Sequence, residues 1–454
     1  MNVVKEQSAI YAERRKRLSS AVGGEPIYLS GHTALPRNFA ANVYRFRQDS
    51  TFLFFSGVSQ PGCGLRIDEG GRSTLYVPPA DPSDALWHGE QPTFEDLGKR
   101  SGVDDVRPVS EGQSRGCHRL PVTDPTVLTE TPSERLVEAV IQLRMCRDET
   151  EVAAIRSALR VTGEAHRWAM AATRPGLYDH EIEALIEYVF SLRGMGLAYP
   201  SIVTKRGEVL HGHAEGLELG VGDLLLVDAG AEEAGGYASD ITRTWPVSGR
   251  FTARQRAVYE AVLEAQKASI DLLKPGVRYK EVHLESARVL TQFARDEGLL
   301  RGDLDGLVEA GCHAVFFPHG VGHLLGLDVH DMELYGDRVG YPVGRDRETQ
   351  FGLSFLRLDR DMSTGMVVTV EPGFYVVPAI LRDVELRTRL GDSVNWDLAE
   401  SWLGFGGVRI EDDVLVTDVG YEVLSADIPR ELCEIEDLVG SGDLPNAQPR
   451  ASSV

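Results

Sequence analysis

The sequence is poor in cysteine, and the cysteines it has are scattered. Five occur among 454 residues, an odd number, and no two are spaced as CxxC. Disulfide frameworks and zinc sites built from cysteine depend on closely spaced sets. We therefore expect free thiols in a reducing cytoplasm and no cysteine-based scaffold.

Long apolar runs and positive charge are also scarce. No stretch approaches the roughly 20 apolar residues of a membrane span, and the first residues lack the apolar core of a signal peptide. Lys and Arg number 47 against 69 Asp and Glu, so the net charge is −22. This charge argues against a nucleic-acid partner and an anionic membrane surface. We expect a cytoplasmic protein with neither partner.

The composition that remains indicates a globular protein with more than one domain. Hydrophobic residues make up 42% of the chain, which is ordinary for folded proteins, and 454 residues exceed one typical core. Strand and helix patterns alternate over 1–145 and predict an α/β domain, with a buried strand at 52–55. A second domain is expected over 148–435. The polar tail 436–454 is expected to be disordered.

Helical periodicity and capping residues predict the helices of the second domain. Apolar residues at helical spacing predict a helix over 149–173, and Asp179 is expected to cap the next one. Thr252 and Gln255 form a capping box for a later helix.

One stretch, 224–246, places two acids at the ends of apolar runs. The first run ends at Asp228, a Gly-rich turn follows, and Asp240 precedes the second run. The pattern predicts a β-hairpin with both carboxylates at one end. Buried like charges repel unless a cation lies between them. The two acids either bind metal ions or flank a solvated loop, and this stretch alone favours the loop.

An internal repeat changes that balance. Residues 148–249 and 252–424 both follow the order helix, helix, strand, strand. The acid-x-Gly ending at Asp228 recurs at Glu371, and Asp240 has a counterpart at Glu411. Self-similarity indicates a duplicated unit, and two copies about a pseudo-twofold axis would bring the four acids together. We interpret them as metal ligands.

Histidines complete a mixed ligand set. His319, His323 and His330 fall within twelve residues, among glycines that permit close backbone approach. One imidazole with four carboxylates suits Mn²⁺, Co²⁺, Fe²⁺ or Zn²⁺, and the carboxylate-rich set favours Mn²⁺. His211 and His213 precede the Asp228 strand and could reach the same pocket, although a solvated loop remains the alternative for His213.

Four motifs, in this order, resemble the pita-bread metallopeptidases, which include aminopeptidase P, prolidase and methionine aminopeptidase. They are VDAG…SDITRT (227–244), HGVGHLLGLDVHD (319–331), VTVEPGFY (368–375) and VRIEDDVLVT (408–417). The stretch YRFRQDSTFLFFSG (44–57) is similar to the N-terminal domain of aminopeptidase P, which methionine aminopeptidase lacks. The resemblance implies an α/β (α+β) protein. Its N-terminal α/β domain would precede a pita-bread catalytic domain with pseudo-twofold duplication.

The resemblance also implies site residues. The positions that match the five family metal ligands are Asp228, Asp240, His323, Glu371 and Glu411, with Asp240 and Glu411 as the bridging carboxylates. His211 and His330 match histidines that hold the substrate and stabilise the tetrahedral intermediate. The remaining matches are Arg409 near the site, the weaker positions His319 and Asp328, and Trp87, which matches a tryptophan that lines the site from a neighbouring subunit.

The implied activity is that of an Xaa-Pro aminopeptidase, which removes the N-terminal residue from peptides with proline at the second position. A hydroxide held by two divalent ions, Mn²⁺ first, would attack the carbonyl carbon before the proline nitrogen. Glu371 would pass the proton to the departing amine, and His211 and His330 would stabilise the oxyanion. The family also implies a homodimer or homotetramer.

Three alternatives stay open. An Xaa-Pro dipeptidase, or prolidase, uses the same metal site and differs in how loops close the pocket. A pita-bread protein that only binds its partner and the metal-free creatinase share the fold, although all five ligand positions here carry competent residues. The turn between Asp228 and Asp240 is longer than the family spacing. The segments 331–361 and 378–404 are also extended, which bears on substrate size. Segment 331–361 is expected to be a loop or a small hairpin over the site.

Overall fold

The computed structural model describes residues 2–79, 84–112, 114–121, 123–124 and 132–442. The chain divides into two compact units. The N-terminal unit comprises Met1–Cys146 with Leu334–Gly336, and the second unit comprises Arg147–Glu333 and Asp337–Val454.

The N-terminal unit is an α/β domain, as predicted. Its main sheet has the order β1-β4-β5-β6, antiparallel except for the parallel pair β5–β6. Its strands are β1 (Ile27–Ser30), β2 (Pro36–Phe39), β3 (Asn42–Val43), β4 (Gly64–Ile67), β5 (Ser73–Val77) and β6 (Asp105–Pro108). Its helices are α1 (Asn2–Ala21), α2 (Ser50–Ser56), α3 (Asp84–His88), α4 (Phe94–Ser101) and α5 (Glu134–Arg144), with 3₁₀ turns at Glu69–Gly71 and Val109–Glu111.

The prediction of a strand at 52–55 is wrong, because these residues lie in helix α2. The Asp49 side chain accepts the N–H of Phe52 at the start of this helix, and Gly57 ends it with a left-handed φ of 63°. Every residue of α2 is buried. A short run that is apolar on all sides has no period, so its sequence does not separate a buried helix from a buried strand.

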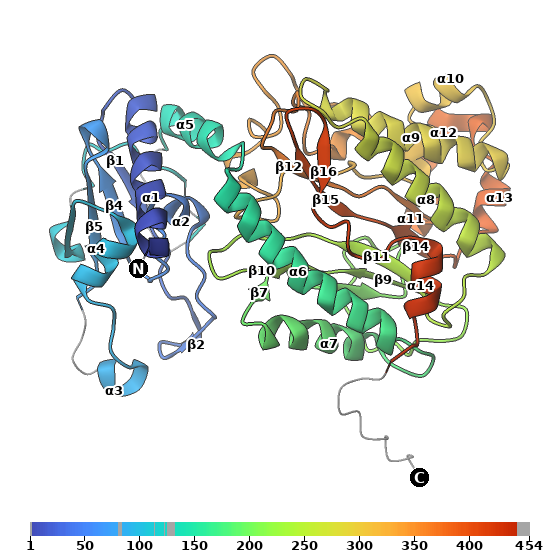
Figure 1. Cartoon of the computed structure of the whole chain (residues 1–454). Coiled ribbons are helices and arrows are strands. Elements are labelled where there is room, and N and C mark those ends of the chain that lie inside the picture. Colours follow the sequence, from blue (N-terminus) through green and yellow to red (C-terminus); the bar gives the residue numbers. More distant parts are fainter. Residues whose placement is uncertain (1, 80–83, 113, 122, 125–131, 443–454) are drawn as a thin grey trace, which may run out of the picture. The chain divides into compact units, whose positions relative to one another are not determined.

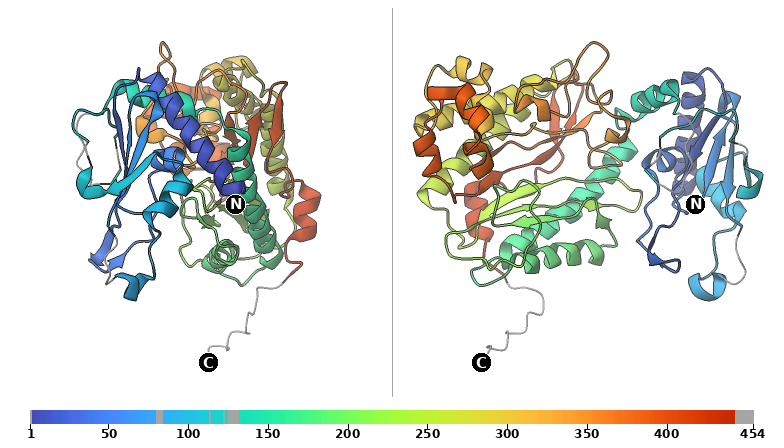
Figure 2. Two further views of the ribbon diagram at one scale, coloured as in Figure 1. Left: turned by 60° about the vertical axis from the view of Figure 1, so that its left-hand side comes forward. Right: turned by 180° about the vertical axis from the view of Figure 1, so that it is seen from behind.

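The second unit repeats one order of elements. Its first half contains α6 (Glu149–Ala172), α7 (Asp179–Leu192), β7 (Gly196–Leu197), β8 (Ile202–Thr204), β9 (Leu224–Asp228), β10 (Ala231–Glu232) and β11 (Thr242–Pro246). Its second half contains α8 (Ala253–Asp271), α9 (Tyr279–Asp296), α10 (Leu304–Glu309), β12 (Val367–Val370), β13 (Gly373–Tyr375), β14 (Gly407–Arg409), β15 (Asp412–Val416), β16 (Tyr421–Val423) and α14 (Leu432–Leu438). In both halves two long helices precede a strand pair. Helices α6 and α7 lie along one side of the strands, and α8 and α9 along the other (Figure 1 and Figure 2).

The strand registers place acids at matching ends of the two strand pairs. Strands β9 and β11 are antiparallel, with Asp228 opposite Thr242. Strands β12 and β15 are antiparallel, with Val370 opposite Asp412. Glu371 directly follows Val370, and Glu411 directly precedes Asp412, so each strand pair ends in two acids. The hairpin predicted over 224–246 is confirmed. Strands β12 and β15 form the corresponding antiparallel pair in the second half, although other elements lie between them in the chain.

Capping explains where the long helices begin. Thr252 and Gln255 form the predicted capping box at the start of α8. The predicted role of Asp179 differs. Tyr178 precedes α7 as its cap residue, and the Asp179 carboxylate instead accepts the N–H groups of residues 215–217. The acid anchors a loop that the helical pattern could not foresee.

The two long segments and the tail take irregular forms. Segment 331–361 contains 3₁₀ turns at Glu333–Tyr335 and Leu353–Phe355 and no described strand, so of the two expected forms, a loop or a small hairpin, it takes the loop. Segment 378–404 contains the short helices α11 (Pro378–Leu381), α12 (Val384–Leu390) and α13 (Trp396–Glu400). The tail predicted from residue 436 differs at its start, because α14 continues to Leu438. Residues 443–454 lie outside the described residues.

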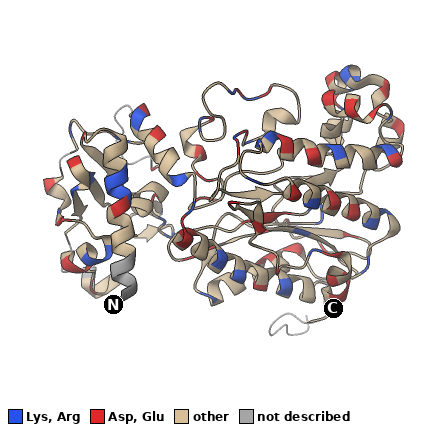
Figure 3. Ribbon diagram, turned by 45° about the horizontal axis from the view of Figure 1, so that its top comes forward, with Lys and Arg blue, Asp and Glu red and all other residues tan. Residues whose placement is uncertain are grey.

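The helix surfaces are polar. Figure 3 shows Lys, Arg, Asp and Glu interspersed along the helices of the second unit. Among the described residues, no helix is both long enough and apolar enough to span a membrane.

Candidate metal centre

The acids at the strand ends converge on one histidine. Asp240, His323 and Glu411 each offer one ligand atom, and these atoms lie within 4.8 Å of one another. His323 Nε2 is 3.3 Å from Asp240 Oδ2 and 3.6 Å from Glu371 Oε1. The Tyr199 hydroxyl links Asp228 to the same cluster, at 2.6 Å from Asp228 Oδ1 and 2.5 Å from Asp240 Oδ1. The structure therefore brings together all five residues of the expected ligand set.

This cluster holds more negative charge than its protein neighbours neutralise. Burial and the charge of Asp228 raise the pKa of Asp240 to about 8. Burial raises the pKa of Glu371 to about 7, and burial with the charge of Asp240 raises that of Glu411 well above its usual range. Divalent cations would allow all the carboxylates to ionise, because an opposite charge close by favours the charged form. Oxygen donors with one imidazole are a fitting set for such ions.

Arg409 is a buried cation at the edge of the cluster. Its Nη2 donates to Asp228 Oδ2 at 2.6 Å, and its Nε donates to Thr242 Oγ1 at 3.0 Å. The Thr242 hydroxyl in turn donates to Glu411 Oε2 at 2.7 Å. One guanidinium thus fixes the orientation of carboxylates from both halves of the unit, yet carries only one positive charge.

Hydrogen bonds to backbone carbonyls define the tautomers of two histidines. His323 Nδ1 donates to the Leu324 carbonyl at 3.1 Å, which leaves the Nε2 lone pair directed toward the acids. His319 Nδ1 donates to the Gly320 carbonyl at 2.8 Å, and its Nε2 accepts the Tyr375 hydroxyl at 2.9 Å. Both ring nitrogens of His319 therefore have protein partners. Its expected contact with substrate stays a prediction.

The other expected histidines lie beside the cluster. The His330 ring is 4.1 Å from that of His323, centroid to centroid, and its Nδ1 is 3.2 Å from Glu333 Oε2. Burial, and then the charge of Arg409, lower the pKa of His211. His213 instead donates through Nδ1 to the Ser201 carbonyl at 3.1 Å.

Two expected residues are not brought into this cluster by any described contact. The backbone N–H of Asp328 donates to Asp331 Oδ1 at 3.1 Å. Trp87 lies on α3 of the N-terminal unit, where its side chain is 75% exposed. Its role stays a prediction.

Sequence reasoning missed Tyr199. Its single hydroxyl hydrogen faces two carboxylate oxygens and can be donated to only one of them, so the other contact requires a proton or a cation. Burial, with the charges of Asp228 and Asp240, raises its pKa well above 10. Tyr199 lies in the irregular chain between β7 and β8, where the sequence has no periodic signal.

Glu333 and Arg357 were also missed. Arg357 Nη1 is 2.7 Å from Glu333 Oε2, and Glu333 is the partner of His330. The charge of His323 and burial lower the pKa of His330, and the Arg357 charge adds to this effect. Arg357 thus supplies a positive charge beside the histidines, with its side chain 41% exposed. Arg357 is one of several arginines in a loop of mixed charge, and no motif there would have indicated its role.

Comparison with known proteins assigns the family. Residues 153–418 match metallopeptidase family M24, and residues 11–120 match the aminopeptidase P N-terminal domain. The chain belongs to metallopeptidase family M24. This confirms the expected pita-bread fold behind an aminopeptidase-P-like domain, and the M24 protein is a metal-dependent peptidase.

Individual relatives of this M24 protein carry two related names. The human Xaa-Pro dipeptidase is 35% identical over 460 residues, which cover 95% of this chain and 92% of the relative. The Xaa-Pro aminopeptidase of Haemophilus influenzae is 32% identical over 456 residues, which cover 94% and 96%. The solved structure of Pseudomonas aeruginosa aminopeptidase PepP has a TM-score of 0.78 and 31% identity, and covers 95% of this chain and 97% of that one.

Proposed function

We propose that this M24 metallopeptidase is an Xaa-Pro aminopeptidase that works with two divalent metal ions, Mn²⁺ first and Co²⁺, Zn²⁺ or Fe²⁺ as alternatives. The observation that carries the proposal is the convergence of Asp240, Glu371 and Glu411 on His323, with Asp228 linked to Asp240 through the Tyr199 hydroxyl and paired with Arg409. The substrate class is supported by relatives named Xaa-Pro aminopeptidase and Xaa-Pro dipeptidase.

Asp228, Asp240, His323, Glu371 and Glu411 would hold the ions, with Asp240 and Glu411 shared between them. Bound divalent ions lower the pKa of water toward neutrality and polarise a carbonyl. Glu371 would accept the proton of the attacking water and give it to the leaving amine. His330 would contact the substrate carbonyl through Nε2, since Nδ1 has Glu333 as its partner. His211 and Arg409 would complete the substrate pocket.

Arg357 supports a second candidate, an Xaa-Pro dipeptidase. In a dipeptide the proline carries the terminal carboxylate, so a cation beside the histidines would bind it. In a longer peptide the same carbonyl belongs to a neutral peptide bond, so Arg357 has no carboxylate to bind at this position. Arg357 is the half-exposed arginine whose charge reaches His330.

Matched peptides separate the two candidates. The Mn²⁺-loaded protein is assayed against an Xaa-Pro dipeptide and an Xaa-Pro-Yaa-Zaa peptide with the same first residue. Release of the first residue from the longer peptide establishes the aminopeptidase, and cleavage of the dipeptide alone establishes the dipeptidase. Cleavage of neither peptide, with metal bound, would overturn both.

Two arginine variants then test the role of Arg357. Arg357→Gln should lower kcat/KM for the dipeptide more than for the longer peptide. Arg345→Gln is the matched control, because Arg345 lies in the same segment and pairs with Asp361 at 2.8 Å. Equal losses of kcat/KM for the two peptides would show that Arg357 does not bind the terminal carboxylate of the dipeptide.

The location and assembly of the protein are part of the proposal. The small number and scattered positions of the cysteines support a cytoplasmic protein. Exposed Phe39, Leu86 and Trp87 on the N-terminal unit support a homodimer or homotetramer, since large apolar side chains at a surface often mark an interface. Sedimentation analysis of the wild type and Trp87→Ala would test the assembly, and a monomeric wild type would refute it.

A further inference from the structure

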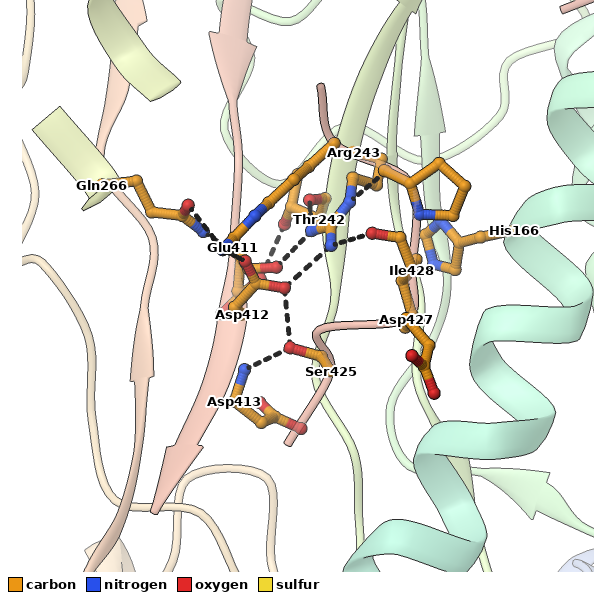
Figure 4. A network of polar contacts seen from close by, with 12 residues as sticks. His166, Thr242, Arg243, Gln266, Glu411, Asp412, Asp413, Ser425, Asp427 and Ile428 are labelled. Carbon is orange, nitrogen blue, oxygen red and sulfur yellow. Dashed lines mark hydrogen bonds and ion pairs between the residues drawn. The ribbon is translucent and has the colours of Figure 1, made fainter. Parts of the chain in front are cut away.

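A buried arginine, Arg243, lies behind the metal centre. Its guanidinium is fully buried on β11, next to Thr242. Nη1 donates to the carbonyls of Thr242 at 3.0 Å and Glu411 at 2.5 Å. Nη2 donates to Asp412 Oδ1 at 2.8 Å and to the Ile428 carbonyl at 3.1 Å, and Nε donates to the Pro429 carbonyl at 2.8 Å. Figure 4 shows the side chain reaching across to the strand that carries Asp412.

Asp412 is held as firmly as Arg243. Its Oδ1 also accepts the Ser425 hydroxyl at 2.6 Å. Its Oδ2 accepts Gln266 Nε2 at 2.7 Å and pairs with Arg430. The carboxylate therefore has partners on both oxygens and cannot swing away from the guanidinium without breaking several hydrogen bonds.

Arg243 and Asp412 lie close in sequence to Asp240 and Glu411, the two acids that would be shared between the ions in the proposed function. Arg243 comes three residues after Asp240, and Asp412 directly follows Glu411. Successive side chains of a strand point to opposite faces, so Thr242 contacts Glu411 on one face while Arg243 and Asp412 pair on the other. The Thr242 carbonyl also accepts the N–H of Glu411 at 3.0 Å. The backbones that carry Asp240 and Glu411 are thus joined from both faces.

We propose that Arg243 and Asp412 are positioning residues that set the separation of Asp240 and Glu411, and with it the ability of the site to hold two metal ions. The inference rests on the proposed two-metal function. A shared carboxylate must be placed to within about 0.5 Å for productive geometry. A buried ion pair is a poor source of stability, because desolvating both charges offsets their attraction. The five hydrogen bonds that Arg243 donates to fixed acceptors instead define the position of β11 relative to β15.

Removing both charges together tests the proposal without leaving Arg243 or Asp412 buried and unpaired. Arg430 loses its contact with Asp412, but its side chain is 19% exposed and still donates to Gln266 Oε1 at 3.1 Å. In Arg243→Met/Asp412→Leu we expect the first Mn²⁺ to bind with little change and the second about 10–100-fold more weakly, as when groups that orient ligands are lost. Titration calorimetry gives both affinities. Electron paramagnetic resonance should change from the spectrum of a coupled Mn²⁺ pair to that of isolated ions. Arg243→Lys should restore the second site only in part, because an ammonium cannot span all the acceptors.

Controls separate positioning from general stability. Arg250→Met removes an exposed arginine paired with Glu436 at 2.9 Å and should bind both ions as the wild type does. If the double variant does not fold, Asp412→Asn keeps the side-chain shape and decides by the same two measurements. Wild-type affinity for both ions and an unchanged spectrum in a folded variant would overturn the proposal. A wild-type protein that binds only one ion would instead overturn the proposed function.

Discussion

Two buried histidines outside the candidate metal centre are expected to make the stability of the fold depend on pH. His283 on α9 and His313 in the 3₁₀ turn Cys312–Val315 are buried, with ring centroids 5.7 Å apart. In the described structure none of their four ring nitrogens has a hydrogen-bond partner. Burial lowers the pKa of His313 from 6.5 to about 4, and burial with the charge of His313 lowers that of His283 well below its usual value. Both rings are therefore neutral in the folded protein.

The sign and size of the effect follow from this difference. Because the unfolded chain binds a proton near pH 6.5 and the folded chain does not, stability is fully present above pH 6.5 and is lost as the pH falls toward 4. At pH 5, His313 alone lowers the free energy of unfolding by about 2 kcal/mol relative to neutral pH. His283 adds a loss of the same sign.

The substitution His313→Phe removes the titrating group and keeps an aromatic ring against His283. We expect the free energy of unfolding of the variant to fall about 2 kcal/mol less than that of the wild type between neutral pH and pH 5. Urea unfolding with a chelator present, at several pH values, measures this difference apart from loss of metal. His180→Gln is the control, because the His180 side chain is 54% exposed. Parallel pH profiles for the wild type and His313→Phe would refute the reasoning.

Three further predictions concern the metal centre. Asp240→Asn should abolish metal binding and peptidase activity together, measured by metal content and peptide hydrolysis; retained turnover with two ions bound would contradict the assignment. His330→Ala should keep its metal but lose about 10²-fold in kcat, because it removes a group that stabilises developing charge. Tyr199→Phe should weaken metal binding about 10–100-fold by freeing the carboxylates it orients, so calorimetry that finds wild-type affinity would exclude this role.

Local signals predicted the regular elements well. The capping box of Thr252 and Gln255 starts α8 where expected, because a cap involves only neighbouring residues. The acids at strand ends were found because apolar runs with a common ending repeat along the chain. Helix α2 was mistaken for a strand at 52–55 because the pattern there carries no such local signal. A run that is buried all round has no polar face to reveal its period.

Three polar side chains around the candidate site could not be assigned a role from the sequence. Tyr199, Arg357 and Arg243 reach the site or its strands from irregular chain or from the reverse face of a strand. Tyr199 and Arg357 belong to none of the quoted motifs, and Arg243 lies in SDITRT, whose spacing does not imply the contacts of its side chain. Their partners lie tens to hundreds of residues away, as in the bonds from Arg243 to Glu411 and Ile428. Such contacts depend on how complete elements pack.

The sequence by itself determined the family resemblance and the duplicated order of elements, and it led to the prediction that four strand-end acids and a histidine form a ligand set. These conclusions need only residue types and spacing along one chain. Tertiary structure alone decided that the five side chains meet, which tautomer His323 adopts, and that Tyr199 and Arg409 hold the carboxylates. Distances between residues remote in sequence are set by the packing of the two strand pairs and of the helices beside them, and the sequence pattern does not contain these distances.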